Sequence, residues 1–202
     1  MKICIWGDST GWGAFDKKMG GWANRLHIWG LSNDNYVYNF SISSNDTSGI
    51  LYALEKEIGI INQVEPEDQY IYVFAIGSND SRYKNTKDNK VVPIDEFRSN
   101  LQKIIDITNQ VTDKIMFVGL KQIDESKTTP IPWEPTEYYE NDDLAEYNKT
   151  IKEVCEKNNT FFLSIRDLLD KEDFEDGLHP NSQGHKKMYE KIKEFIKKNL
   201  LK

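Results

Sequence analysis

This chain of 202 residues is short of cysteine, of long apolar runs and of positive charge. It contains no run of about 18 apolar residues, so we expect no membrane-spanning segment. Its 2 cysteines are too few for a disulfide framework. One disulfide between Cys4 and Cys155 is an alternative, but we expect two buried free thiols and no metal bound to them.

Negative charge exceeds positive charge, with 33 Asp and Glu residues against 26 Lys and Arg residues and a formal net charge of −7. Phosphate binding needs a clustered basic face, which an acidic chain would have to build against its own field. We therefore expect no nucleic-acid partner, and a small or uncharged substrate fits better. The strand-like residues 2–6 leave no room for a secretory leader, so the expected location is cytoplasmic.

The composition is that of a globular protein, and secondary-structure patterns alternate along the chain. Apolar residues make up 38% of the sequence, which at this length suits a single domain over residues 1–202. Short apolar runs predict five strands, and the helical periodicity between them predicts five helices. The predicted strands are 2–6, 36–40, 70–76, 114–120 and 160–164, and the predicted helices are 19–30, 47–64, 94–110, 142–158 and 182–200. This alternation predicts a three-layer α/β/α sandwich around a parallel five-stranded sheet.

Two connections, 81–93 and 121–141, are longer than is usual in such a fold. Long ordered loops are often binding elements, and a surface excursion packed by its own aromatic residues is the equal alternative. The sequence leaves both interpretations open.

Polar residues follow the predicted strands at the edge where open parallel sheets bind ligands. The segments are Gly7-Asp8-Ser9, Ser41-Ile42-Ser43-Ser44, Gly77-Ser78-Asn79-Asp80 and Asp176-Gly177-Leu178-His179-Pro180. Each of them alone is a common turn. Together, in order and after different strands, they bring a hydroxyl, a polar turn, a carboxamide and an Asp/His pair to one edge.

A serine hydroxyl becomes a good nucleophile only when an oriented base takes its proton. Asp176 and His179 lie three residues apart, so one turn can bring the carboxylate to the imidazole. Gly177 permits the tight backbone and Pro180 restrains His179 toward an extended conformation. The spacing suits a base and its orienting group, with Ser9 as the hydroxyl that they activate.

These four segments resemble the four sequence blocks of the SGNH hydrolase superfamily, the GDSL-like lipases and acylhydrolases. The resemblance implies that Ser9 is the nucleophile, His179 the base and Asp176 its orienting group. It also implies an oxyanion hole made by the backbone N–H groups of Ser9 and Ser44 and the side chain of Asn79. The implied fold is the flavodoxin-like sandwich, and neither a cofactor nor a metal is implied.

Two residues depart from the family pattern. Thr10 stands where the family usually has Leu or Ile, and we expect it to change packing rather than chemistry. Ser44 replaces the oxyanion glycine, and a positive φ there would cost a non-glycine residue about 1 kcal/mol or more. The pocket is therefore expected to be reshaped, or Ser43 supplies the donor instead.

The other candidate polar residues have simpler expected roles. We expect His27 to be a packed or surface residue. His185 could be drawn with Asp176 as a metal site, but the family resemblance needs no metal there. Asp8, if extended, points away from Ser9 and suits a structural hydrogen bond.

We predict a carboxylic-ester hydrolase that acts through an acyl-enzyme on a small ester with a short acyl group, such as an O-acetyl group. Trp12 and Trp133 are candidate stacking surfaces for that substrate. The alternative from another class is a flavodoxin-like flavin-binding electron carrier, because residues 9–11 could cradle a phosphate. A hydrolase-like binding module without activity is a further alternative.

Overall fold

The centre of the molecule is a parallel five-stranded sheet, seen in a computed structural model that describes residues 1–64 and 69–201. The strand order is β2-β1-β3-β5-β7. The strands are β1 (Lys2–Gly7), β2 (Tyr36–Asn39), β3 (Tyr70–Ala75), β5 (Ile115–Val118) and β7 (Phe161–Leu163). All five predicted strands and the parallel sheet are confirmed, with ends shifted by at most a few residues.

The two faces of this sheet belong to two different apolar cores. Side chains alternate along a strand, so Cys4, Trp6 and Phe74 enter one core while Ile3 and Ile5 enter the other. Nearly every residue of β1 and β3 is buried. Burial on both faces explains why these strands are continuous apolar runs rather than alternating apolar and polar residues.

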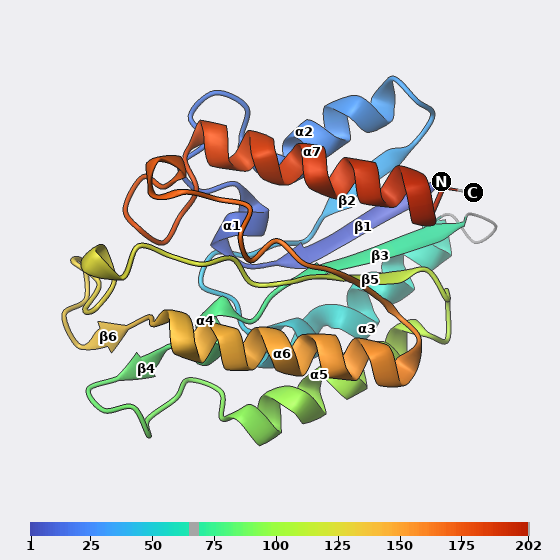
Figure 1. The fold of residues 1–202 in the computed structure, drawn as a ribbon. Helices are drawn as coiled ribbons and strands as arrows, with labels where there is room; N and C mark the ends of the chain where they lie inside the picture. Colours follow the sequence, from blue (N-terminus) through green and yellow to red (C-terminus); the bar gives the residue numbers. More distant parts are fainter. Residues whose placement is uncertain (65–68, 202) are drawn as a thin grey trace.

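Helices cover both faces of the sheet, as Figure 1 shows. Helices α2 (Gly21–Leu31) and α7 (Ser182–Asn199) pack on one face, and α3 (Thr47–Val64), α5 (Ile94–Thr108) and α6 (Asn141–Asn158) pack on the other. The five predicted helices are therefore confirmed, as is the three-layer sandwich. Among the described residues, no helix is both long enough and apolar enough to cross a bilayer. Cys4 and Cys155 are buried free thiols, as expected.

The two long connections contain structure that the sequence patterns did not predict. Strand β4 (Tyr83–Lys84) in the first pairs antiparallel with β6 (Glu137–Tyr138) in the second. The rings of Tyr83 and Tyr138 stack with their centroids 4.9 Å apart. Strands of two residues carry no detectable periodicity, so the sequence could not show that these loops brace each other.

Strand order reverses at β1, because β2 lies on one side of it and β3 on the other. The segments that leave β1, β2 and β3 therefore emerge side by side at the carboxyl edge of the sheet (Figure 1). Two of them begin with single helical turns that were not predicted, α1 (Ser9–Trp12) and α4 (Ser78–Ser81). Short 3-10 turns also occur, η1 (Glu125–Lys127) and η2 (Lys171–Asp173).

Candidate active site

Ser9 is the first residue of α1, directly after β1. Asp8 caps this turn, because its carboxylate accepts the Thr10 N–H at 2.9 Å. Asp8 thus makes the structural hydrogen bond that we expected. Gly11 brings the turn against the loop after β2, since a Cβ atom there would lie 2.4 Å from the Ser41 hydroxyl. The nucleophile candidate is therefore held by a cap on one side and by a close backbone approach on the other.

Ser9, His179 and Asp176 form one chain of hydrogen bonds. The Ser9 hydroxyl lies 2.9 Å from Nε2 of His179, and Nδ1 of the same ring lies 2.7 Å from Oδ2 of Asp176. A carboxylate only accepts hydrogen bonds, so Nδ1 carries the proton and Nε2 is the acceptor that faces Ser9. The structure thus brings together the three residues that the sequence singled out, from opposite ends of the chain.

The Asp176 carboxylate is held by its own turn as well as by the imidazole. Its Oδ1 accepts the backbone N–H of Leu178 at 3.0 Å and that of His179 at 2.7 Å. Gly177 has φ 92°, a conformation that glycine adopts without strain. Burial alone would raise the pKa of Asp176, but the hydrogen bonds from the side chain and backbone of His179 hold this pKa below its ordinary value. The carboxylate therefore stays ionised at neutral pH.

Asn79 lies in α4, and both ends of its carboxamide are anchored. Its Nδ2 donates to the Asn45 carbonyl at 2.7 Å, and its Oδ1 accepts the Tyr139 hydroxyl at 2.7 Å. A carbonyl cannot donate, so Nδ2 must face Asn45 and the orientation of the amide is defined. Nδ2 carries a second N–H that the bond to Asn45 does not use. The sequence did not predict this contact of Tyr139, because its partner lies 60 positions earlier.

Ser44 lies exposed in the loop after β2, one residue before Asn45. Its φ is 64°, which lies in the left-handed region. This is the positive φ whose cost we considered because Ser44 stands where the family has glycine. Such a conformation costs a serine about 1 kcal/mol more than a glycine. The loop nevertheless turns at this position, since the Asn45 N–H donates to the Ile42 carbonyl at 3.1 Å. Ser44 therefore adopts the positive φ that was considered from the sequence, with a serine in the strained position.

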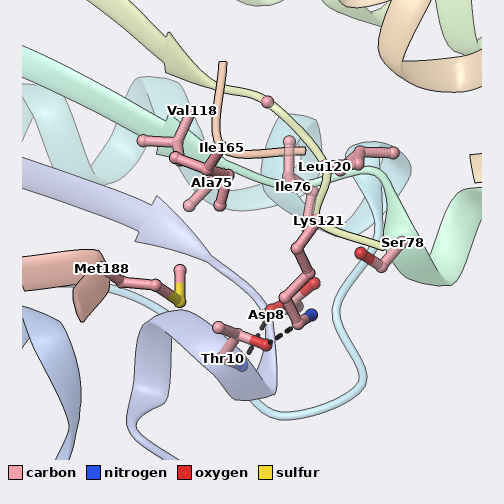
Figure 2. A pocket seen from close by; sticks show the side chains of 11 residues that line it. Asp8, Thr10, Ala75, Ile76, Ser78, Val118, Leu120, Lys121, Ile165 and Met188 are labelled. Atoms are coloured by element: carbon pink, nitrogen blue, oxygen red, sulfur yellow. Dashed lines mark hydrogen bonds between the residues drawn. The ribbon is translucent and has the colours of Figure 1, made fainter. Parts of the chain in front are cut away.

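Two buried ionisable groups, Asp8 and Lys121, lie next to Thr10 (Figure 2). Asp8, Thr10 and Lys121 line a cavity of about 20 Å³ together with Ser78 of α4. The Lys121 ammonium lies 3.4 Å from the Thr10 hydroxyl. Burial raises the pKa of Asp8 and lowers the pKa of Lys121, and each shift is opposed by the charge of the other group. The only sequence signal for Lys121 was a lysine soon after an apolar strand.

Aromatic side chains lie around His179. The Trp133 ring centroid is 5.9 Å from that of His179, and the Phe15 ring centroid is 5.1 Å from it. The sequence singled out Trp133 but not Phe15. Trp12, the other stacking candidate, lines a separate hollow of about 340 Å³ with Asn39 and the half-buried His27.

His185 is not beside Asp176 and has a different role. Its Nε2 lies 2.9 Å from the Ala14 carbonyl, and its Nδ1 accepts the Trp22 N–H at 3.3 Å. Burial lowers the pKa of His185 to about 4, so this buried ring is neutral. In the described part of the chain, no group of three or more His, Cys, Asp or Glu residues is placed to hold a metal ion.

The fold and the site define a class of protein. A Ser-His-Asp hydrogen-bond chain at the carboxyl edge of a parallel α/β sheet is the arrangement of a serine hydrolase. The chain belongs to the GDSL-like Lipase/Acylhydrolase family, whose model matches residues 5–187. The enzyme is thus a serine esterase or acylhydrolase, and the flavin-carrier alternative is not favoured.

Solved structures share this fold at low sequence identity. A psychrotrophic esterase from Pseudoalteromonas sp. matches with a TM-score of 0.71 and 17% identity, over 100% of this chain and 99% of that one. An acetylxylan esterase from Geobacillus stearothermophilus matches with 0.71 and 17%, over 96% and 93%. A lipase/acylhydrolase from Enterococcus faecalis matches with 0.72 and 20%, over 98% and 95%. A comparison with curated protein sequences finds no match.

Proposed function

We propose that this protein hydrolyses small carboxylic esters through an acyl-enzyme formed on Ser9. The observation that carries the proposal is the continuous hydrogen-bond chain from Ser9 Oγ through the His179 ring to Asp176. The unprotonated Nε2 of His179 faces the Ser9 hydroxyl, and the ionised carboxylate of Asp176 holds Nδ1 of the same ring.

The reaction takes two steps. His179 Nε2 accepts the Ser9 proton while Oγ attacks the ester carbonyl carbon. The tetrahedral intermediate then collapses, the C–O bond to the alcohol breaks, and His179 returns the proton to the leaving oxygen. In the second step His179 deprotonates a water, which attacks the acyl-serine. The C–O bond to Ser9 Oγ then breaks, His179 returns the proton to Oγ, and the carboxylic acid leaves.

The negative charge that develops on the carbonyl oxygen needs donors that are already in place. We assign this role to the remaining Nδ2 N–H of Asn79 and to the backbone N–H groups of Ser9 and Ser44. The Asn79 amide needs little reorganisation, because Asn45 and Tyr139 already hold it. A preorganised donor lowers the barrier because its orientation is fixed before charge develops.

The acyl group of the substrate is short in this proposal, with O-acetyl esters as the leading class. The cavity beside the Ser9 turn is lined by Asp8, Thr10 and Lys121 rather than by Ser9, His179 or Asn79, and it measures about 20 Å³. That space holds roughly one water molecule and no acyl tail. The fold shared with an acetylxylan esterase is compatible with this substrate class. Trp12 and Trp133 remain candidate stacking surfaces for the rest of the substrate.

A panel of esters with one alcohol and acyl groups of rising length tests the proposal. We expect kcat/KM to fall steeply beyond about four carbons, because the cavity beside the Ser9 turn is too small to cover a longer chain. Acetylated sugars belong in the same panel. Equal turnover from acetate to octanoate would contradict the short-acyl assignment, and no turnover of any ester would contradict the function itself.

A further inference from the structure

Two exposed aromatic rings lie beside the imidazole of His179 and come from different loops. Phe15 lies between α1 and α2, and Trp133 lies in the long connection before β6. Phe15 is 43% exposed and Trp133 is 52% exposed, although both rings are within 6 Å of the His179 ring. Each ring therefore contacts the base with one part and leaves apolar surface open beside it.

The backbone that presents Phe15 is strained and firmly held. Phe15 has φ 64°, which is unfavourable for a bulky residue and recurs at functional sites. The residue before it is fixed by the buried His185, which bonds the Ala14 carbonyl at 2.9 Å. The residue after it is Asp16, whose side chain is fully buried.

The Asp16 carboxylate organises the whole loop that carries Phe15. It accepts the backbone N–H groups of Lys18 and Met19 at 3.1 Å and that of Gly21 at 3.0 Å. It also pairs with Arg25 at 2.9 Å. An exposed phenyl ring on a loop this well anchored is preorganised, and preorganisation reduces the entropy lost when a ligand covers the ring.

The chemistry of the site decides which part of the substrate meets these rings. His179 must pass its proton to the leaving oxygen, so that oxygen comes within hydrogen-bond reach of Nε2. The carbonyl oxygen turns instead toward Asn79 and the backbone donors. Groups that surround the His179 ring therefore face the alcohol part of the ester.

We propose that Phe15 and Trp133 form the subsite for the alcohol part of the substrate and select alcohols that carry a ring with an apolar face. A pyranose sugar and an aryl ring share this chemistry, since both can lie against an aromatic surface. This inference rests on the proposed hydrolysis at Ser9 and extends it from the acyl side to the alcohol side.

The test is a two-way matrix of substrates. One arm keeps the acyl group as acetyl and varies the alcohol among ethanol, a phenol and a methyl pyranoside. The other arm keeps the phenol and lengthens the acyl chain. Phe15→Ala and Trp133→Ala should each lower kcat/KM for the two ring alcohols by about 10-fold, because each removes one apolar contact face. Ethyl acetate should change by less than about 3-fold, and the acyl preference should keep its shape.

Met19→Ala is the matched control, because Met19 is an exposed apolar side chain in the same loop and is 37% exposed. It should leave every ratio unchanged. Phe15→Leu and Trp133→Phe keep apolar surface and should restore part of the ring preference, and circular dichroism verifies that each variant is folded. A larger loss of kcat/KM on phenyl acetate than on the acetylated pyranoside would indicate a specificity for aryl alcohols. A larger loss on the acetylated pyranoside would indicate a specificity for sugars.

Three results would overturn the inference. Equal losses of kcat/KM on ethyl acetate and on the acetates of ring alcohols would mean that Phe15 and Trp133 only support His179. A changed acyl-length profile would place them on the acyl side, and unchanged ratios would leave them no part in binding. In each case hydrolysis by wild type and its loss in Ser9→Ala would still uphold the proposed function, so the two failures are distinguishable.

Binding can be measured without turnover in the Ser9→Ala variant. Titration with a methyl pyranoside or a phenol should change the tryptophan fluorescence, because Trp133 is half exposed beside His179. The change should be lost in Ser9→Ala combined with Trp133→Phe. A fluorescence change that survives the loss of Trp133 would contradict the assignment.

Discussion

The two halves of the candidate site are built in different ways. The triad depends on one turn, Asp176 to His179, and on the start of α1, and its hydrogen bonds are local once the two segments meet. The proposed oxyanion side depends on Asn79, whose amide is oriented by Asn45 from one loop and Tyr139 from another. We therefore expect loss of Ser9 from the proposed triad to remove nearly all activity. On the proposed oxyanion side, activity should fall in steps as the residues that hold Asn79 are removed one at a time.

Loss of the nucleophile is the largest expected effect. Ser9→Ala should lower kcat by at least about 10⁴, because it leaves the donors but no group to carry the acyl chain. Circular dichroism should stay native, since the Asp8 cap and Gly11 remain. An unchanged rate in a folded variant would mean that Ser9 is not the nucleophile and that the proposed triad is wrong.

Loss of the amide donor should have the next largest effect. Asn79→Ala should lower kcat by about 10² to 10³ and change KM much less, because the donor binds more strongly as charge develops on the oxygen. Steady-state kinetics on an acetate ester would measure both constants. A wild-type rate would reduce Asn79 to a turn residue, and the donors would have to be sought elsewhere.

Removal of the support behind Asn79 should give an intermediate effect. Tyr139→Phe deletes the hydroxyl that holds Oδ1 but leaves the Asn45 anchor, so we expect kcat to fall about 10-fold with KM nearly unchanged. The fall should be absent when Asn79 is already alanine, because the hydroxyl acts through the amide.

Tyr147→Phe is the matched control for that variant. Tyr147 is also buried, and its hydroxyl also donates a hydrogen bond, to the Val92 carbonyl. Its removal should lower the free energy of unfolding by about 1 kcal/mol, as for Tyr139→Phe, and leave kcat unchanged. If both variants lose activity alike, Tyr139 is structural and the stepwise picture of the oxyanion side is wrong.

Relief of the strained backbone at Ser44 should have a small effect on activity. Ser44→Gly keeps the backbone N–H and permits φ 64°, so kcat should stay within about 3-fold of wild type. Thermal unfolding and kinetics would be measured together. A loss larger than that of Asn79→Ala would give the Ser44 hydroxyl a part in the chemistry.

The loop that carries Phe15 should affect stability in a pH-dependent way. Burial alone would raise the pKa of Asp16, but hydrogen bonds from Ser182 and from the N–H groups of Met19, Gly21 and Lys18 lower it to about 2. The unfolded chain then binds the proton more tightly than the folded one, so this stabilisation is present above about pH 4 and is lost as the pH falls through about 2.

Asp16→Asn should accordingly lower the free energy of unfolding by about 2 kcal/mol at pH 7. The gap from wild type should narrow as the pH falls below about 4. Denaturant titrations of both proteins from pH 7 to pH 2.5 would measure this gap. A gap that stays constant over this range would mean that the Asp16 charge contributes nothing to the loop.

The fold and the triad were largely predictable because their signals are local. Continuous apolar runs indicated strands that are buried on both faces, and the Asp-x-x-His spacing indicated one turn with a carboxylate beside an imidazole. The β4–β6 pair, Lys121 and Phe15 were missed for the opposite reason. Each acquires its role from a contact with a residue far away in the sequence.

The sequence by itself determined the order of strands and helices along the chain and the family, and it indicated the residues of the proposed triad. Periodicity and short spacings involve residues that are close together in the sequence, so these features could be predicted from it. Only the tertiary structure decided which groups surround that triad. The partner of Asn79 lies 60 positions away in Tyr139, and the rings beside His179 come from residues 15 and 133. Contacts of this kind depend on how loops from different strands meet at the switch point between β1 and β3, and no local pattern encodes that meeting.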